Sequence, residues 1–369
     1  MKKRLVAFLV LFALICTAAL SLASCGEKYP PQESTSEEKR TVMTLTYEDE
    51  SYDVSYELYR SFFLQLKSTV DGGDSTVWTG AEKDKYISEI DSLILDRICE
   101  IYSVFHLSKK VGINPYSRDM DKLIKEYIEV AVEGGTIGGS EYKGYDGNYE
   151  AYLADLKAMN LNYSVHELLI RYSIALTELT EYYVGAPDEN EFKNGAIEYT
   201  KDAVRAFYLD ENESRRMLRV FLSADAFTES RAQQIRDGII SKPNEDSVKN
   251  YIIQFSTSGA TDIKNGEVIG KYTLDKFYYS EITESLFNMG IGETSEVIEL
   301  NSDELEGFTI VYRTSTSDEH FEACYSDILL SYLQNEAGKL INNAAADMSK
   351  NAEYSDYLKN LDRSTVSIN

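Results

Sequence analysis

The chain contains long stretches in which apolar residues return every three or four positions, and shorter stretches in which they alternate with polar residues. The first spacing is typical of an amphipathic helix and the second of a half-buried strand. The clearest helix covers residues 82–110, and Gly112 and Pro115 mark where it ends. Its apolar face consists of Ile87, Ile90, Ile94, Ile98, Ile101 and Phe105.

The first half of the chain is helical after one opening hairpin. Alternation over residues 43–54 predicts the hairpin, and a helix is expected to begin near Ser55. Helical spacing predicts further helices over 120–131, 148–159 and 164–179. A loop rich in glycine and tyrosine is expected between the first two of these helices.

The pattern then changes to strands mixed with helices. The expected order is strand, two helices, strand, helix and two strands. These elements cover 215–222, 228–240, 246–255, 267–272, 280–287, 296–300 and 307–313. From Phe321 onward helical spacing returns, with an apolar face that a single helix cannot bury. We therefore expect this last helix to pack on the helices of the first half.

These patterns predict an α+β protein in which a mixed module is inserted into a mainly helical lobe. Residues 41–205 form the first part of the lobe, and residues 321–369 return to it as a C-terminal helix. Residues 210–318 form the module, which has an ordinary domain size. A chain of 369 residues is long for one core, which agrees with two lobes.

The N-terminus has the layout of an export signal. Residues 2–4 are basic, residues 5–20 carry no charge, and Leu-Ala-Ser directly precedes Cys25. This motif resembles the bacterial lipobox, which implies removal of residues 1–24, diacylation of Cys25 and anchoring to the cell membrane outside the cytoplasm. An ordinary signal peptide or a membrane-spanning anchor is the alternative, but the apolar run is shorter than the ~20 residues that span a bilayer. Residues 25–40 are polar and contain proline, so we expect a flexible tether.

Charge limits the possible partners. The formal net charge of -25 would repel phosphate backbones, so nucleic acid is not an expected partner. The same acidity is also the ordinary surface of a soluble protein. The 28 tyrosines suit a surface that holds peptides, although tyrosine also occurs on ordinary half-buried helix faces.

The sequence gives no reason to expect a metal or a cofactor. His106, His166 and His320 have no Cys, His or carboxylate neighbour at ligand spacing, and we expect the first two on helix surfaces. Cys99 and Cys324 are expected as two separately buried thiols, with a disulfide between them as the alternative outside the cell. No phosphate-binding loop, dinucleotide fingerprint or catalytic triad can be drawn.

The mixed module carries motifs of a known family. Residues 266–270, Gly-Glu-Val-Ile-Gly, and residues 292–297, Gly-Glu-Thr-Ser-Glu-Val, stand in an element order that resembles the parvulin-type peptidyl-prolyl isomerases. The helical lobe resembles the chaperone lobe of the SurA- and PrsA-like foldases, in its opening strand turn and in the helix that ends at residues 109–113. The two resemblances together cover nearly the whole mature chain.

The parvulin resemblance implies a peptide-binding cleft and also shows where this chain departs from the family. Parvulins twist the prolyl bond between two histidines, an acid or thiol, and apolar side chains. Arg219 and Thr309 stand at the positions of the two histidines, and the acid or thiol falls near Ser258 or Asp262. No residue is therefore assigned as catalytic. The cleft candidates are Arg219, Ile269, Phe277, Ile282, Met289 and Thr309.

The resemblances imply a lipid-anchored foldase or chaperone outside the cytoplasm that binds unfolded or nascent secreted polypeptides. Loss of both histidines favours binding over catalysis. An apolar cleft can favour a twisted amide without them, so an active prolyl isomerase is the first alternative. A scaffold for envelope assembly that uses the same fold is the second alternative.

Overall fold

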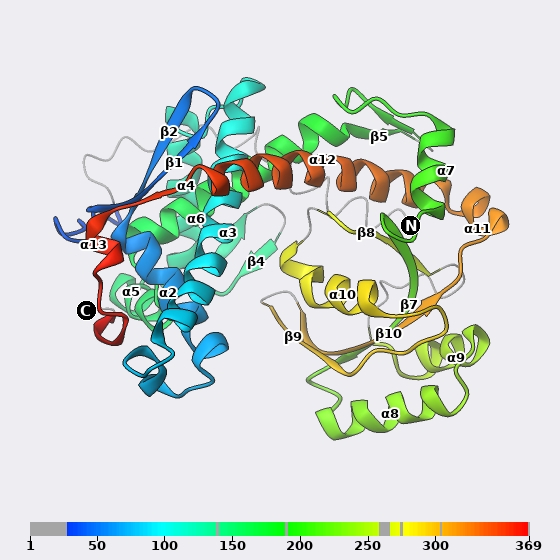
Figure 1. Cartoon of the computed structure of the whole chain (residues 1–369). Coiled ribbons are helices and arrows are strands. Elements are labelled where there is room, and N and C mark those ends of the chain that lie inside the picture. Colours follow the sequence, from blue (N-terminus) through cyan, green and yellow to red (C-terminus); the bar gives the residue numbers. More distant parts are fainter. Residues whose placement is uncertain are drawn as a thin grey trace. The chain divides into compact units, whose positions relative to one another are not determined.

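The computed structural model describes residues 28–137, 140–188, 191–257, 266–273, 276–302 and 305–367, which form an α+β fold (Figure 1). The first unit of the chain combines Met1–Leu179 with Ile341–Asn369, and the second unit is Thr180–Leu340. Residues 180–205 and 321–340, which the sequence pattern placed in the helical lobe, belong to the second unit. Cys25 and the predicted signal peptide lie outside the described residues.

The first unit consists mainly of helices, with one sheet of three strands in the order β11-β1-β2. Two of its helices, α6 and α12, continue across the boundary into the second unit. Its strands are β1 (Thr41–Tyr47), β2 (Glu50–Ser55), β3 (Gly135–Ile137), β4 (Ser140–Tyr142) and β11 (Glu353–Tyr354). Its helices are α2 (Tyr56–Asp71), η1 (Ser75–Trp78), α3 (Lys83–Lys110), α4 (Arg118–Glu133), α5 (Tyr149–Ala158), α6 (Tyr163–Val184), α12 (Tyr325–Lys350), α13 (Asp356–Lys359) and η2 (Arg363–Thr365).

Helix α3 confirms the clearest sequence prediction. Ile90, Ile94 and Ile98 on its predicted apolar face are completely buried, whereas Ile87 at its beginning is only partly covered. The helix expected near Ser55 is α2, which begins at Tyr56. Ser55 caps its N-terminus, because its side chain accepts a hydrogen bond from the backbone N–H of Leu58.

The sheet of the first unit joins the beginning and the end of the chain. Strand β1 pairs antiparallel with β2 on one side and with β11 on the other, where Met43 lies opposite Tyr354. The backbone N–H of Ser355 then donates to the carbonyl of Val42 at 3.0 Å. The last residues of the chain therefore complete a sheet that begins at residue 41.

The expectation that His106 and His166 lie on helix surfaces was wrong for His106, which is buried, and His166 is half-buried. His106 lies near the end of α3. The turn between β1 and β2 packs over the last turns of α3 and covers the imidazole, which is 4% exposed. Its Nδ1 lies 2.9 Å from the hydroxyl of Tyr52, and its Nε2 lies 3.2 Å from Glu48. Each of the three histidines has a tyrosine hydroxyl within hydrogen-bond distance: Tyr52 at His106, Tyr152 at His166 and Tyr208 at His320.

The expected glycine- and tyrosine-rich loop contains a short hairpin, β3 and β4, which the sequence pattern did not reveal. The hairpin follows α4 directly, and the chain returns to the helix end at Gly144. A Cβ atom on Gly144 would lie 2.0 Å from the backbone nitrogen of Gly134, so only glycine permits this close return.

The second unit is a four-stranded antiparallel sheet, in the order β8-β7-β10-β9, with helices on both faces. The order along the chain matches the predicted strand, two helices, strand, helix and two strands. These elements are β7 (Ser214–Ser223), α8 (Glu229–Ser241), α9 (Glu245–Phe255), β8 (Glu267–Gly270), α10 (Lys276–Asn288), β9 (Ile298–Ser302) and β10 (Leu305–Thr314). The unit also contains β5 (Ala186–Asp188), β6 (Glu191–Lys193), α7 (Lys201–Leu209) and α11 (Asp318–Ala323).

The two faces of this sheet have separate cores. Leu218, Val220 and Leu222 of β7 pack with residues of α8 and α9. Met217 and Phe221, which point the other way, pack with residues of α10. The alternation along β7 therefore assigns each position to one of the two helical layers.

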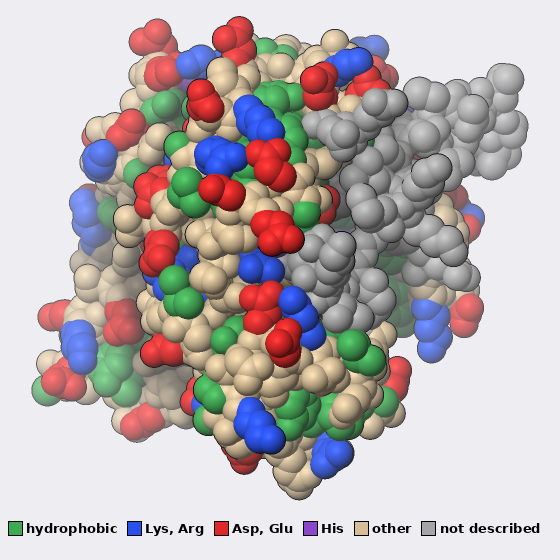
Figure 2. Space-filling model, turned by 90° about the vertical axis from the view of Figure 1, so that its right-hand side faces the viewer, with side chains coloured by type: hydrophobic (Ala, Val, Ile, Leu, Met, Phe, Trp, Pro, Cys, Tyr) green, Lys and Arg blue, Asp and Glu red, His purple; other side chains and the backbone are tan. Residues whose placement is uncertain are grey.

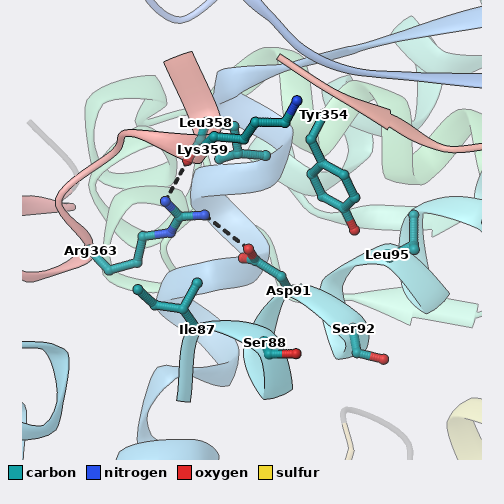
Figure 3. A pocket seen from close by; sticks show the side chains of 9 residues that line it. All are labelled: Ile87, Ser88, Asp91, Ser92, Leu95, Tyr354, Leu358, Lys359 and Arg363. Atoms are coloured by element: carbon teal, nitrogen blue, oxygen red, sulfur yellow. Dashed lines mark hydrogen bonds and ion pairs between the residues drawn. The ribbon is translucent and has the colours of Figure 1, made fainter. Parts of the chain in front are cut away.

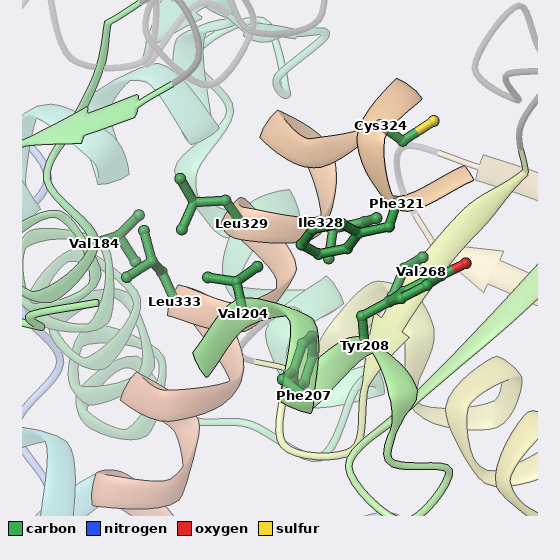
Figure 4. Packing of buried hydrophobic residues seen from close by; sticks show 10 residues of the cluster. All are labelled: Val184, Val204, Phe207, Tyr208, Val268, Phe321, Cys324, Ile328, Leu329 and Leu333. Atoms are coloured by element: carbon green, nitrogen blue, oxygen red, sulfur yellow. The ribbon is translucent and has the colours of Figure 1, made fainter. Parts of the chain in front are cut away.

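Helix α12 covers the outer edge of β8 within the second unit. The hydroxyl of Ser331 donates to the carbonyl of Val268 at 2.7 Å, and the side chain of Asn335 accepts from the backbone N–H of Tyr272 at 2.8 Å. A Cβ atom on Gly338 would lie 1.7 Å from the Tyr272 carbonyl oxygen, so no side chain fits there. Apolar residues of α7, α11 and α12 pack beside this edge (Figure 4).

We expect His166 to make the first unit sensitive to acid. Burial lowers the pKa of His166 to about 4, from about 6.5 in an unfolded chain. The unfolded chain therefore binds a proton that the folded chain does not, and stability is lost as the pH falls from about 6.5 to about 4. The loss attributable to this residue is up to about 3 kcal/mol.

Urea unfolding at several pH values measures this effect in the wild type and in His166→Gln, which keeps a hydrogen-bonding group beside Tyr152. The variant should lose less stability across this pH window. Equal losses in the two proteins would show that His166 is not the source.

Candidate functional site

Strand alternation and register place Arg219 and Thr309 on one face of the second unit's sheet. Arg219 lies between Met217 and Phe221 on β7, and these two neighbours pack in the core beneath α10. Thr309 on β10 lies directly opposite Phe221, and opposite residues of an antiparallel pair share a face. Arg219 and Thr309 therefore both face the α10 layer.

The apolar candidates come together on the same face. Ile282 and Met289 belong to the core formed by α10, β7, β9 and β10, and Ile269 of β8 packs against it. Phe277 is in the first turn of α10. The structure thus brings Arg219, Thr309, Ile269, Ile282 and Met289 into one layer. Ser258 and Asp262 lie outside the described residues.

This layer is tightly packed. Arg219 is 2% exposed, and Ile282 and Thr309 are fully buried. The Thr309 hydroxyl donates to the carbonyl of Val220 at 3.3 Å. These side chains therefore belong to the interior of the second unit.

The charge of Arg219 is matched within the same layer. Its Nη2 donates to Glu267 Oε1 at 3.2 Å, and Glu267 lies on β8 directly opposite Met217. A buried charge is tolerated when an opposite charge and hydrogen bonds compensate for lost water. Arg219 thus links β7 to β8 through this ion pair.

Two further arginines on this face were missed in the sequence. Arg215 donates to the carbonyls of Leu286 and Met289 at 2.8 and 2.9 Å, and Arg313 also donates to the Met289 carbonyl. Cations at a helix C-terminus are favoured by the helix dipole and satisfy its unpaired carbonyls. Side chains two residues apart on a strand share a face, so the position of Arg219 on this face also predicts that Arg215 lies on it.

A pocket in the first unit is the second candidate (Figure 3). It is an open depression of about 500 Å³ between α3 and the C-terminal segment that contains β11, α13 and η2. Leu95 and Leu358 are buried in its wall, whereas Ser88, Ser92 and Lys359 are exposed at its edge. The residues that line it are Ile87, Ser88, Asp91, Ser92, Leu95, Tyr354, Leu358, Lys359 and Arg363.

A charged network closes one side of this pocket. The Nη2 of Arg363 donates to Asp91 Oδ2 at 2.9 Å, and the hydroxyl of Tyr59 donates to Asp91 Oδ1 at 2.5 Å. Burial raises the pKa of Asp91, and the bonds from Tyr59 and Arg363 oppose that rise. Because Asp91 and Arg363 satisfy each other, the pocket suits a neutral apolar group better than an ion.

Among the described residues no group of three His, Cys, Asp or Glu side chains could hold a metal ion, and no helix is long and apolar enough to cross a bilayer. Cys99 is buried within the first unit and Cys324 within the second.

Comparison with known proteins finds no matching family model and no matching curated protein. Solved structures similar to this chain include PrsA from Bacillus subtilis, with 12% identity and a TM-score of 0.23 over 73% of this chain and 87% of that one. The foldase protein PrsA from Streptococcus pneumoniae has 13% identity and a TM-score of 0.23 over 88% and 100%. The peptidylprolyl isomerase PrsA from Bacillus anthracis has 14% identity and a TM-score of 0.23 over 70% and 100%.

We expect Arg219→Met to destabilise the second unit by about 3 kcal/mol, because the carboxylate of Glu267 loses its compensating charge. The double variant Arg219→Met/Glu267→Met should recover most of that loss, since it removes both charges from the layer. Urea unfolding followed by circular dichroism measures both changes. A double variant no more stable than the single variant would show that the pair does not act as a unit.

Proposed function

We propose that the chain is a lipid-anchored foldase or chaperone outside the cytoplasm, which binds unfolded or nascent secreted polypeptides. The observation that supports this most is the face of the second unit's sheet on which Arg219, Thr309 and Ile282 lie together. The parvulin resemblance expects these three positions to share one layer. The register of β7 and β10 supports this for Arg219 and Thr309, and the packing of Ile282 from α10 in the same core supports it for the third position.

The same layer favours binding over prolyl isomerisation. Rotation about a peptide bond has a barrier of ~18–20 kcal/mol, and a catalyst must contact the twisted amide to lower it. A substrate could reach Arg219, Ile282 or Thr309 only by displacing packed neighbours, because all three are buried. In our proposal the module is therefore a degenerate parvulin fold that serves as a support or grip.

The pocket on α3 is the proposed client contact in the first unit. Its volume lies in the range typical of pockets that take one ligand group. The apolar wall would accept an aliphatic or aromatic side chain of an extended client. The hydroxyls of Ser88 and Ser92 at its edge could bond to the client backbone.

The charge distribution agrees with a polypeptide partner and not with a nucleic acid. On the face drawn in Figure 2, the acidic and basic side chains of the described residues are interspersed, without a continuous basic surface. A phosphate backbone needs such a surface.

We expect Ser92→Trp to weaken chaperone activity, because an indole at this exposed position of α3 would occupy the pocket. The control is Arg97→Trp, which adds the same side chain at an exposed position of α3 that does not line the pocket. Residues 26–369 should suppress aggregation of a reduced, unfolded client, and Ser92→Trp should need at least fivefold more protein for equal suppression. Equal potency of the two variants would exclude the pocket as the client site.

We expect no acceleration of cis–trans exchange in a short Xaa-Pro peptide, whose uncatalysed exchange takes tens to hundreds of seconds. A clear acceleration that Ile282→Trp abolishes would instead favour an active isomerase. A single co-purifying envelope protein, in place of a range of clients, would favour an assembly scaffold.

A further inference from the structure

The segment expected to be a flexible tether is bound to the surface of the first unit along the residues that the structure describes. At its beginning the hydroxyl of Tyr29 donates to Glu133 Oε1 at 2.9 Å, and Lys28 forms an ion pair with the same carboxylate. Lys28 and Tyr29 both donate hydrogen bonds to this carboxylate, and these bonds lower the pKa of Glu133. Glu133 is the last residue of α4, so the start of the segment is fixed at one end of that helix.

Two contacts continue this attachment beyond Tyr29. The hydroxyl of Tyr149, the first residue of α5, donates to the carbonyl of Pro30 at 2.7 Å, and its ring lies 5.3 Å from the ring of Tyr29. The hydroxyl oxygens of Ser34 and Ser164 then lie 2.8 Å apart.

The end of the segment is joined to the buried part of α2. Arg60 is 3% exposed, and its Nη2 donates to Glu38 Oε1 at 2.7 Å. The backbone N–H groups of Glu57 and Tyr56 donate to the carbonyls of Glu38 and Arg40 at 3.0 and 2.8 Å. Residues 28–40 are therefore fixed at their beginning, middle and end. A flexible tether would make none of these contacts, so the described part of the segment is not one.

Attachment at Lys28 leaves little chain between the folded unit and the lipid. Only Gly26 and Glu27 separate Cys25 from Lys28. Three residue steps span at most about 10 Å when fully extended. If Cys25 carries the diacylglyceryl group, as the proposed function requires, the backbone of Lys28 lies within about 10 Å of the residue held at the bilayer surface. Tyr29 and Glu133 are the neighbours of Lys28 in this attachment.

We propose that the surface around Tyr29, Tyr149 and the loop of residues 142–147 lies against the lipid headgroups, so that the first unit has one fixed orientation on the membrane. This proposal rests on the lipidation of Cys25. Gly147 lies next to Tyr29, because a Cβ atom there would be 3.6 Å from the hydroxyl of Tyr29. The glycine- and tyrosine-rich loop then belongs to the membrane side and is not a client contact.

The chemistry of this surface suits the headgroup layer. Tyrosine is favoured at membrane interfaces, where its ring meets apolar groups and its hydroxyl meets water. Tyr142 is 42% exposed, and Tyr149 lies at the start of the segment's contacts. Acidic residues Glu129 and Glu133 lie beside Lys28, so the surface is not a basic patch. The two acyl chains therefore supply the binding, and high salt should not alter it.

The test uses the full lipidated chain in phosphatidylcholine vesicles that contain a lipid with a nitroxide quencher on its headgroup. A fluorophore is attached at one of two positions. Glu150→Cys lies beside Tyr149, at the proposed membrane surface. Asp356→Cys lies beside Tyr357, whose hydroxyl donates to Glu37 near the other end of the segment. Both positions are exposed, whereas Cys99 and Cys324 are buried and should not react. We expect at least threefold more quenching at position 150, unchanged in 1 M salt.

Release of the segment provides the matched control. The variant Tyr29→Ala/Glu133→Gln/Tyr149→Phe removes the contacts at its beginning and should bring the quenching at position 150 close to that at position 356. Equal quenching at the two positions in the unreleased chain would overturn the proposal. Mass spectrometry of the same sample separates the two claims, because an unmodified Cys25 would overturn the lipid anchor together with the orientation.

A distance measurement without lipid tests the attachment itself. In residues 26–369, spin labels at Pro31→Cys and Glu150→Cys, both exposed positions, should give one narrow distance distribution, which becomes broad in the release variant. A broad distribution in the unreleased chain would overturn the proposal and leave the lipid anchor unaffected.

Discussion

The pairing of β1 with β11 is the contact on which the rest of the structure depends. It places the end of the chain in the same sheet as its beginning, and Arg363 extends the connection through its bonds to Tyr59 and Asp91. These partners are far apart in sequence; Arg363 and Tyr59 are separated by 304 positions. In this chain the two ends share one unit, and the middle of the chain forms another. Thr180–Leu340 is that middle part, and it is long enough to build separate cores on both faces of its own sheet.

The parts of the fold that the sequence predicted well are those in which burial follows a regular period. Helix α3 and strands β7 and β10 are examples, because each has a continuous face in contact with a core. The β3–β4 hairpin was not predictable, since three-residue strands are too short to show a period. The burial of His106 also escaped prediction, because the turn that covers it comes from a different part of the chain.

The candidate sites show the same division. That Arg219 and Thr309 share a face follows from strand alternation and register, which the motif order was sufficient to suggest. Their burial depends on the side chains of α10 and could not be derived from the strands alone. The pocket could not be predicted from any pattern in the sequence, because its two walls, α3 and the C-terminal segment, meet only in the folded chain. On the sheet face, Arg215, Arg219 and Arg313 make polar contacts that only the folded arrangement reveals.

The position of β11 after the second unit in the sequence has a consequence for the order of folding. Thr180–Leu340 is continuous, so it holds all of its own sheet as soon as that stretch has been synthesised. The first unit is completed later, because its third strand and Arg363 are made after that stretch. Until then β1 presents an unpaired edge and the side of α3 near Asp91 remains uncovered. A protein that we propose assists unfolded chains thus passes through a stage in which its own N-terminal unit is one of them.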